Sequence, residues 1–257
     1  ITQDKPSDTI RIFALGGSTT FGSITTSDFT TIPGFLQKKI DNEHSSTVEV
    51  INAGILGANS SLEKQLLMNY VEKFNPDIII VYDGANNSTV DLVLEQDADD
   101  HITWAIVTYV YQFYRTPTFI YKNFVSEGLT LDIDEKMSEQ LAQSWKDDWK
   151  EACSQKRDYK IIIFIQPTLS NKIFLSDDES RQLKLDPRNE QMKYNLEKIA
   201  DISSELKGTC DGVFDLRSSF ENITEPIFFD NAHVNDLGNK IIAEKMYENL
   251  LPYLPRV

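Results

Sequence analysis

The stretch that decides the fold runs from Ile10 to Gly22 and reads IRIFALGGSTTFG. Its first six residues, mostly apolar or β-branched, are typical of a buried strand. The paired glycines Gly16 and Gly17 then remove side-chain bulk and permit unusual backbone angles. Ser18 is therefore predicted to stand where a strand gives way to a loop or helix, with its hydroxyl above the sheet. Gly-rich loops of this kind also bind phosphate, but a Walker loop requires a lysine, and none follows here.

Outward from this stretch, short apolar runs alternate with amphipathic helical patterns along the chain. The predicted strands are residues 10–15, 48–51, 77–82, 159–165 and 213–216. The predicted helices are residues 32–41, 61–74, 134–153, 188–206 and 235–250. This alternation predicts an α/β fold, a three-layer α/β/α sandwich around a five-stranded parallel sheet. Ligands of such sheets bind beyond the carboxyl ends of the strands.

With 257 residues, of which 40% are hydrophobic, the chain is predicted to form one domain over residues 1–257. The segment 88–133 does not fit the alternation, because an acidic stretch (95–100) is followed by an aromatic-rich one (104–124). We expect a helical cap there, which either supplies an apolar wall to an acyl or glycosyl pocket or simply packs onto the domain. A smaller insertion is expected at 167–187.

The charge of the chain bears on its partners. The net charge of −15 repels phosphate backbones, so no nucleic-acid partner is expected. Two cysteines, Cys153 and Cys210, are too few for a disulfide-built scaffold and lack the spacing of a zinc site, so neither a metal nor a cofactor is expected. Both precede predicted strands at one end of the sheet. They are therefore expected to form either one disulfide or two buried free thiols.

The amino terminus bears on location. The chain begins at Ile1 rather than Met, and we expect an upstream segment that was processed or left out, for which a signal peptide and an anchor are the two candidates. Membrane contact is expected only through such a segment. We expect the protein to be located outside the cytoplasm or at the cell surface.

The second chemical motif is FDNAHVN at residues 229–235, just ahead of the last predicted helix. An acid and an imidazole three positions apart, Asp230 and His233, can lie on one side of a turn, where the carboxylate orients the ring. The alternative is an ordinary cap of the last helix. The other two histidines, His44 and His101, are interpreted as a solvated turn residue and a surface residue of the insertion.

Two further loops reach the same edge of the predicted sheet as Ser18. NAGILGAN (52–59) follows the second strand and YDGANN (82–87) follows the third. A tetrahedral oxyanion needs fixed N–H donors about 3 Å away. The backbone N–H groups of Ser18 and Gly57, with the side-chain amide of Asn86, are the predicted donors, although each loop alone is also ordinary turn chemistry.

These four blocks, in this order from about Ile10 to Leu250, resemble those of the SGNH (GDSL-like) hydrolases. The resemblance implies a flavodoxin-like fold, Ser18 as nucleophile, His233 as base and Asp230 as its orienting acid. It also implies Ser18, Gly57 and Asn86 as oxyanion donors.

The resemblance has two departures. Gly17 stands where the family usually has aspartate, a GGST variant, and Asn87 stands where aspartate commonly follows the asparagine. The GGST variant resembles branches that act on acylated polysaccharides, although the family also includes lipases, thioesterases and acyltransferases.

The α/β-hydrolase nucleophile elbow is the competing interpretation of the serine motif. It requires glycine where Thr20 stands, and that fold keeps its acid and histidine far apart in sequence. The sequence therefore predicts a serine esterase acting on acyl esters, short-chain or acetyl, of a carbohydrate or lipid. The alternatives are an O-acyltransferase on a polysaccharide with the same triad, and a non-catalytic carbohydrate-binding module.

Overall fold

The computed structural model describes residues 2–44, 47–89, 135–185 and 188–254. Apart from Ser88 and Thr89, the predicted cap at 88–133 lies outside these residues, and so does His101. The single domain over residues 1–257 and its cap stay predictions. No helix in the described ranges is long and apolar enough to cross a bilayer.

Five parallel strands form one sheet in the order β2-β1-β3-β4-β5. They are β1 (Thr9–Gly16), β2 (Thr47–Gly54), β3 (Ile78–Asp83), β4 (Lys160–Ile165) and β5 (Gly212–Asp215). In the register, Gly16 pairs with both Gly54 and Tyr82, so the first three strands end level with one another. The loops after these strands therefore open at one edge.

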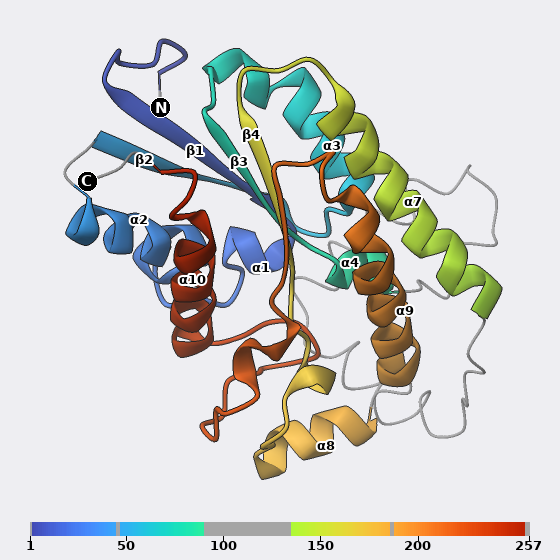
Figure 1. Ribbon diagram of the computed structural model, residues 1–257. Helices are drawn as coiled ribbons and strands as arrows, with labels where there is room; N and C mark the ends of the chain where they lie inside the picture. The colour runs from blue at the N-terminus through green and yellow to red at the C-terminus, as the bar shows by residue number, and fades with distance from the viewer. Residues whose placement is uncertain (1, 45–46, 90–134, 186–187, 255–257) are drawn as a thin grey trace, which may run out of the picture.

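Helices cover both faces of the sheet, which confirms the predicted three-layer sandwich (Figure 1). The longer ones are α2 (Ile32–Glu43), α3 (Ser60–Asn69), α7 (Glu135–Ser154), α8 (Asp177–Leu185), α9 (Arg188–Ser203) and α10 (Asp236–Leu250). Two single-turn helices, α1 (Ser18–Phe21) and α4 (Ala85–Ser88), begin directly beyond β1 and β3. Helices α2 and α10 lie on one face, α3, α7 and α9 on the other, and α8 outside both layers.

The core is built from the alternation of side chains along the strands. Ile80 on β3 packs in the cluster that includes α2 and α10, whereas its neighbour Val81 packs in the cluster that includes α7 and α9. Both faces are covered, so β3 and most of β4 are fully buried, as is typical of parallel strands between two helix layers.

Two predicted helices end earlier than expected. The one predicted at 61–74 stops at Asn69 and is followed by a 3₁₀ turn, Val71–Phe74, since Tyr70 leaves helical geometry (φ −129°, ψ −55°). The one predicted at 188–206 becomes a 3₁₀ turn at Ser204–Leu206.

The insertion at 167–187 contains α8, which the sequence analysis missed. The signal was present: Ser176 and Glu179 have the spacing of a capping box, and each bonds the other's backbone N–H.

The structure also tests the predictions for the two cysteines and for His44, which lie outside the site. Cys153 and Cys210 form a disulfide, with Cα atoms 5.0 Å apart, joining the end of α7 to the segment before β5. The interpretation of His44 as a solvated turn was wrong, because its Nε2 lies 3.0 Å from the hydroxyl of Tyr247 on α10.

Candidate active site

Ser18 is presented by a sharp turn at the end of β1. Gly16 adopts φ +154°, and a Cβ there would lie 2.0 Å from Oγ1 of Thr20, so only glycine fits. Helix α1 then begins at Ser18 itself. As the first residue of a helical turn, Ser18 has a backbone N–H with no acceptor inside that turn. The sequence thus leaves both its hydroxyl and its N–H at the carboxyl edge of the sheet.

The structure brings His233 and Asp230 to Ser18 in a line. Nε2 of His233 lies 2.7 Å from Oγ of Ser18, and Nδ1 of the same ring lies 2.8 Å from Oδ2 of Asp230. The neutral tautomer with its proton on Nδ1 satisfies both contacts, because it leaves Nε2 free to accept the serine proton. The His233 side chain is 24% exposed, so the ring is partly covered but accessible.

The loop that carries this pair is a narrow hairpin. Phe228 and Val234 form an antiparallel bridge, and the N–H of Phe229 donates to the carbonyl of His233 at 2.9 Å. At the tip, Oδ1 of Asp230 accepts from the backbone N–H groups of Ala232 and His233 at 2.9 and 2.8 Å. The carboxylate is therefore fixed by its own turn before it meets the imidazole.

The electrostatics favour an ionised Asp230. Burial by itself opposes ionisation, but the His233 imidazole and the two backbone N–H groups outweigh it and hold the pKa of this carboxyl below its ordinary value. The acid is thus an acceptor for Nδ1–H over the range in which a neutral imidazole can act as a base.

The predicted oxyanion donors lie on the loops after β2 and β3. Gly57 sits in a turn with φ +72°, and nothing lies within 4 Å of where a Cβ would stand. Asn86, on α4, donates through Nδ2 to the carbonyl of Ala58 at 2.5 Å. A Cβ added at Gly17 would lie 2.3 Å from that same Nδ2, so the amide packs directly over the residue before Ser18.

The position after Asn86 has a structural contact in this chain. Asn87 accepts from the backbone N–H of Ser60 at 3.0 Å and donates to the Ser60 hydroxyl at 2.9 Å. It therefore ties the loop after β3 to the start of α3. An amide serves this exchange because it supplies both a donor and an acceptor.

Gln166 was missed by the sequence analysis. It follows β4 directly, is buried, and its Oε1 lies 3.4 Å from Oγ1 of Thr19, next to the nucleophile. Its position immediately after a buried strand was the available signal, because all carboxyl ends of a parallel sheet meet at one edge.

The sequence analysis also missed a hydrogen bond that joins the loop before α2 to the first residue of α10. Oδ2 of Asp236 accepts from the Thr26 hydroxyl at 2.5 Å.

A metal centre has no support in the described ranges. They contain no group of three or more histidine, cysteine, aspartate or glutamate side chains that could hold an ion. The chemistry available at the site is that of a hydroxyl, an imidazole, a carboxylate and amide N–H groups.

Comparison with known proteins places the fold. No family model and no curated protein sequence matches the chain. Among solved structures, a gut microbial diltiazem-metabolizing enzyme matches with a TM-score of 0.60 and 14% identity, over 96% of this chain and 48% of that one. A two-domain esterase active on acetylated mannans matches with a TM-score of 0.52 and 15% identity, over 97% and 50%. The chain thus spans about half the length of these two proteins.

A third match has nearly the same length as this chain. The lipase/acylhydrolase from Enterococcus faecalis matches with a TM-score of 0.52 and 15% identity, over 96% of this chain and 97% of that one. These similarities show that the chain has the fold of the SGNH-type esterases and acylhydrolases, as the sequence motifs predicted.

Proposed function

We propose that this protein is a serine esterase that hydrolyses acyl esters through an acyl-enzyme. The observation that carries the proposal is the continuous hydrogen-bonded line from Oγ of Ser18 through the His233 ring to Asp230. A hydroxyl becomes a strong nucleophile when a base takes its proton, and that base works when a third group fixes its orientation. The three side chains come from two motifs that are far apart in the sequence: Ser18 and His233 are in contact although 215 positions separate them.

The reaction begins with attack by Oγ of Ser18 on the ester carbonyl carbon, while His233 takes the serine proton. The negative oxygen of the tetrahedral intermediate is stabilised by the N–H groups of Ser18 and Gly57 and the amide of Asn86. His233 then protonates the leaving alcohol, and the acyl group stays on Ser18. Water, deprotonated by His233, attacks this ester, and collapse of the second intermediate returns the proton to Ser18 and releases the acid.

For the substrate, we propose short acyl groups, acetyl above all, on a carbohydrate alcohol. Two observations support this. On the side of Ile24 and Asn239, the cavity beside Ser18 and His233 measures about 10 Å³, about the space of one water molecule, so that side has no room for a long acyl chain. A protein of the same fold is an esterase active on acetylated mannans.

We also propose an oxidising location, outside the cytoplasm or at the cell surface. The disulfide between Cys153 and Cys210 supports it, because such bonds persist in oxidising compartments and are rare in the cytosol. Substrates outside the cytoplasm include acylated polysaccharides, so this location agrees with the proposed substrate class.

Active-site labelling tests the reaction type. A fluorophosphonate probe should modify the wild-type protein at Ser18, and Ser18→Ala should lose both the labelling and the hydrolysis of p-nitrophenyl acetate. Full activity in Ser18→Ala would contradict the assignment of the nucleophile, and an unlabelled wild type would favour a non-catalytic binding module. The matched control is Ser204→Ala, an exposed serine in the 3₁₀ turn after α9.

Product analysis tests the fate of the acyl group. With an acetylated oligosaccharide and an unmodified oligosaccharide present together, hydrolysis releases free acetate. Acetyl groups appearing on the second oligosaccharide would identify an acyltransferase instead.

A further inference from the structure

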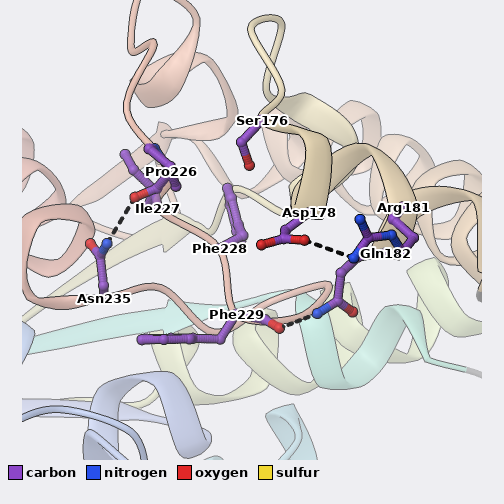
Figure 2. A pocket seen from close by; sticks show the side chains of 9 residues that line it. All are labelled: Ser176, Asp178, Arg181, Gln182, Pro226, Ile227, Phe228, Phe229 and Asn235. Carbon is purple, nitrogen blue, oxygen red and sulfur yellow. Dashed lines mark hydrogen bonds and ion pairs between the residues drawn. The ribbon is translucent and has the colours of Figure 1, made fainter.

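Helix α8 and the turn before it lie against the hairpin that carries Asp230 and His233. A cleft of about 440 Å³ separates part of α8 from residues 226–229 (Figure 2). The polar side chains that line this cleft already have partners: Arg181 pairs with Asp178, Gln182 donates to the carbonyl of Phe229, and Asn235 donates to that of Pro226. Of these contacts, the one from Gln182 joins α8 to the hairpin, and the one from Asn235 lies at the base of the hairpin itself.

A buried ion pair contacts two of the residues that line this cleft, Ile227 and Phe228. The side chains of Lys172 and Glu179 are 0% and 1% exposed, and Nζ lies 2.7 Å from Oε2. Two buried charges are tolerated when the remaining hydrogen-bonding capacity of both is filled. Here it is filled by the hairpin: Oε1 of Glu179 accepts from the N–H groups of Ile227 and Phe228 at 2.9 and 3.0 Å. Lys172 donates to the carbonyl of Glu225 at 2.6 Å.

Two more contacts extend this attachment to the tip of the hairpin. Gln182 donates to the carbonyl of Phe229 at 2.6 Å, and the N–H of Leu169 donates to the carbonyl of Asn231 at 2.8 Å. The insertion thus bonds the hairpin backbone at 225, 227, 228, 229 and 231, on both sides of Asp230. Burial by itself would raise the pKa of Glu179, but Lys172 and the backbone N–H groups outweigh it and hold the pKa at about 2, so the carboxylate remains an acceptor.

We infer that Lys172 and Glu179 are positioning residues for the Asp230–His233 pair, and that residues 168–182 form a brace which sets the distance from the imidazole to Ser18. The inference rests on the proposed function. Its physical basis is that the hairpin has one antiparallel bridge of its own, so its direction depends on these external contacts. A base that moves by about 1 Å from its nucleophile can lose about a hundredfold in rate.

The test replaces both charges together, because removing one leaves the other buried and unpaired. In Lys172→Met/Glu179→Met the ion pair and the acceptor for the N–H groups of Ile227 and Phe228 are both absent, while side-chain size is nearly kept. We expect kcat on p-nitrophenyl acetate to fall by about ten- to a hundredfold with KM within about twofold. The rate of fluorophosphonate labelling should fall in the same proportion.

The matched control is Asp211→Asn. Asp211 pairs with Arg157, and it accepts from the backbone N–H of Ile161. It therefore resembles Glu179 in its contacts but lies beside the amino end of β4. This variant should lower the melting temperature and leave kcat within about twofold of wild type.

A second measurement separates positioning from stability. The proton between Nδ1 of His233 and Asp230 gives a strongly deshielded ¹H NMR signal, which should persist in Asp211→Asn and broaden or vanish in the double variant. A folded double variant that keeps both this signal and a kcat within about twofold of wild type would overturn the inference.

Two other results can still decide the inference: a double variant that does not fold, and a wild-type protein without esterase activity. If the double variant does not fold, Gln182→Ala removes the hydrogen bond to the carbonyl of Phe229 and leaves the ion pair in place. It should lower kcat in the same direction, and an unchanged kcat overturns the inference. If the wild-type protein neither hydrolyses esters nor reacts with the probe, the proposed function fails. The NMR signal then still tests whether the brace holds the two side chains together.

Discussion

The α-carbon of Gly17 lies against the side-chain amide of Asn86, so closely that a Cβ on Gly17 would stand 2.3 Å from Nδ2. The backbone of Gly17 has φ −81° and ψ −151°, so it does not use the positive φ that favours glycine. The glycine is therefore required by this contact and not by its backbone angles. The same amide donates to the carbonyl of Ala58 at 2.5 Å.

Gly17→Ala should consequently displace the amide of Asn86 and lower kcat by about tenfold or more, up to the effect of removing an oxyanion donor, about a hundredfold. The measurement is a double-mutant cycle with Asn86→Ala on p-nitrophenyl acetate. Because both changes act on one donor, Gly17→Ala should cause little further loss in the Asn86→Ala background. Fully multiplicative effects would contradict the shared cause.

Asp230→Asn should lower kcat by about a thousandfold or more, since an amide no longer selects the tautomer with its proton on Nδ1. Binding groups are unaffected, so KM should change little. Steady-state kinetics checks this, with Asp147→Asn on the exposed face of α7 as the control that retains full activity. A loss of only two- to threefold would argue that another group orients His233.

The buried carboxyl of Asp83, at the end of β3, should titrate near pH 6. Burial raises its pKa from 3.8 to about 6, although N–H groups of Gly84, Trp145 and Trp149 donate to it and oppose the rise. Tryptophan emission should change with a midpoint near pH 6. In a Trp104→Phe background only these two indoles remain.

The same titration has a defined effect on stability. The folded-state pKa of Asp83 lies above the ordinary value, so the native protein holds the proton more tightly than the unfolded chain. Its contribution to the free energy of unfolding therefore falls by roughly 3 kcal/mol as the pH rises from about 4 to about 6. Urea unfolding should therefore show that the free energy of unfolding of Asp83→Asn rises relative to that of wild type as the pH increases across this window. A pH-independent difference would contradict the raised pKa.

Removing the disulfide should weaken the fold and spare the chemistry. The bond closes a loop with a sequence separation of 57, for which the chain-entropy model gives about 4 kcal/mol. Cys153→Ala/Cys210→Ala should lose an amount of this order in urea unfolding. Its kcat at 25 °C should stay unchanged, because the bond lies beside the start of β5, away from the edge that carries Ser18. A large loss of kcat in this variant would contradict the prediction and would show that the position of α7 affects the active site.

Much of the fold followed from patterns that are local in sequence. The strand ending in Gly16, the turn at Ser18 and the pair at Asp230 and His233 each depend on neighbours a few residues away, so their positions could be predicted. The end of α3 at Asn69 could not, because the helical pattern of apolar residues continues through Phe74 while the backbone changes to a tighter turn. Helix α8 had its capping box, but its polar composition concealed it.

The sequence by itself determined the class of fold and which residue types meet at the carboxyl edge of the sheet. The reason is that the strand period and the position of glycines are set by backbone sterics. Only the tertiary structure decided that Cys153 bonds Cys210, that Gly17 is required by Asn86, and that Lys172 and Glu179 hold the hairpin of His233. Those outcomes depend on distances between segments far apart in the chain, and such distances are set by packing.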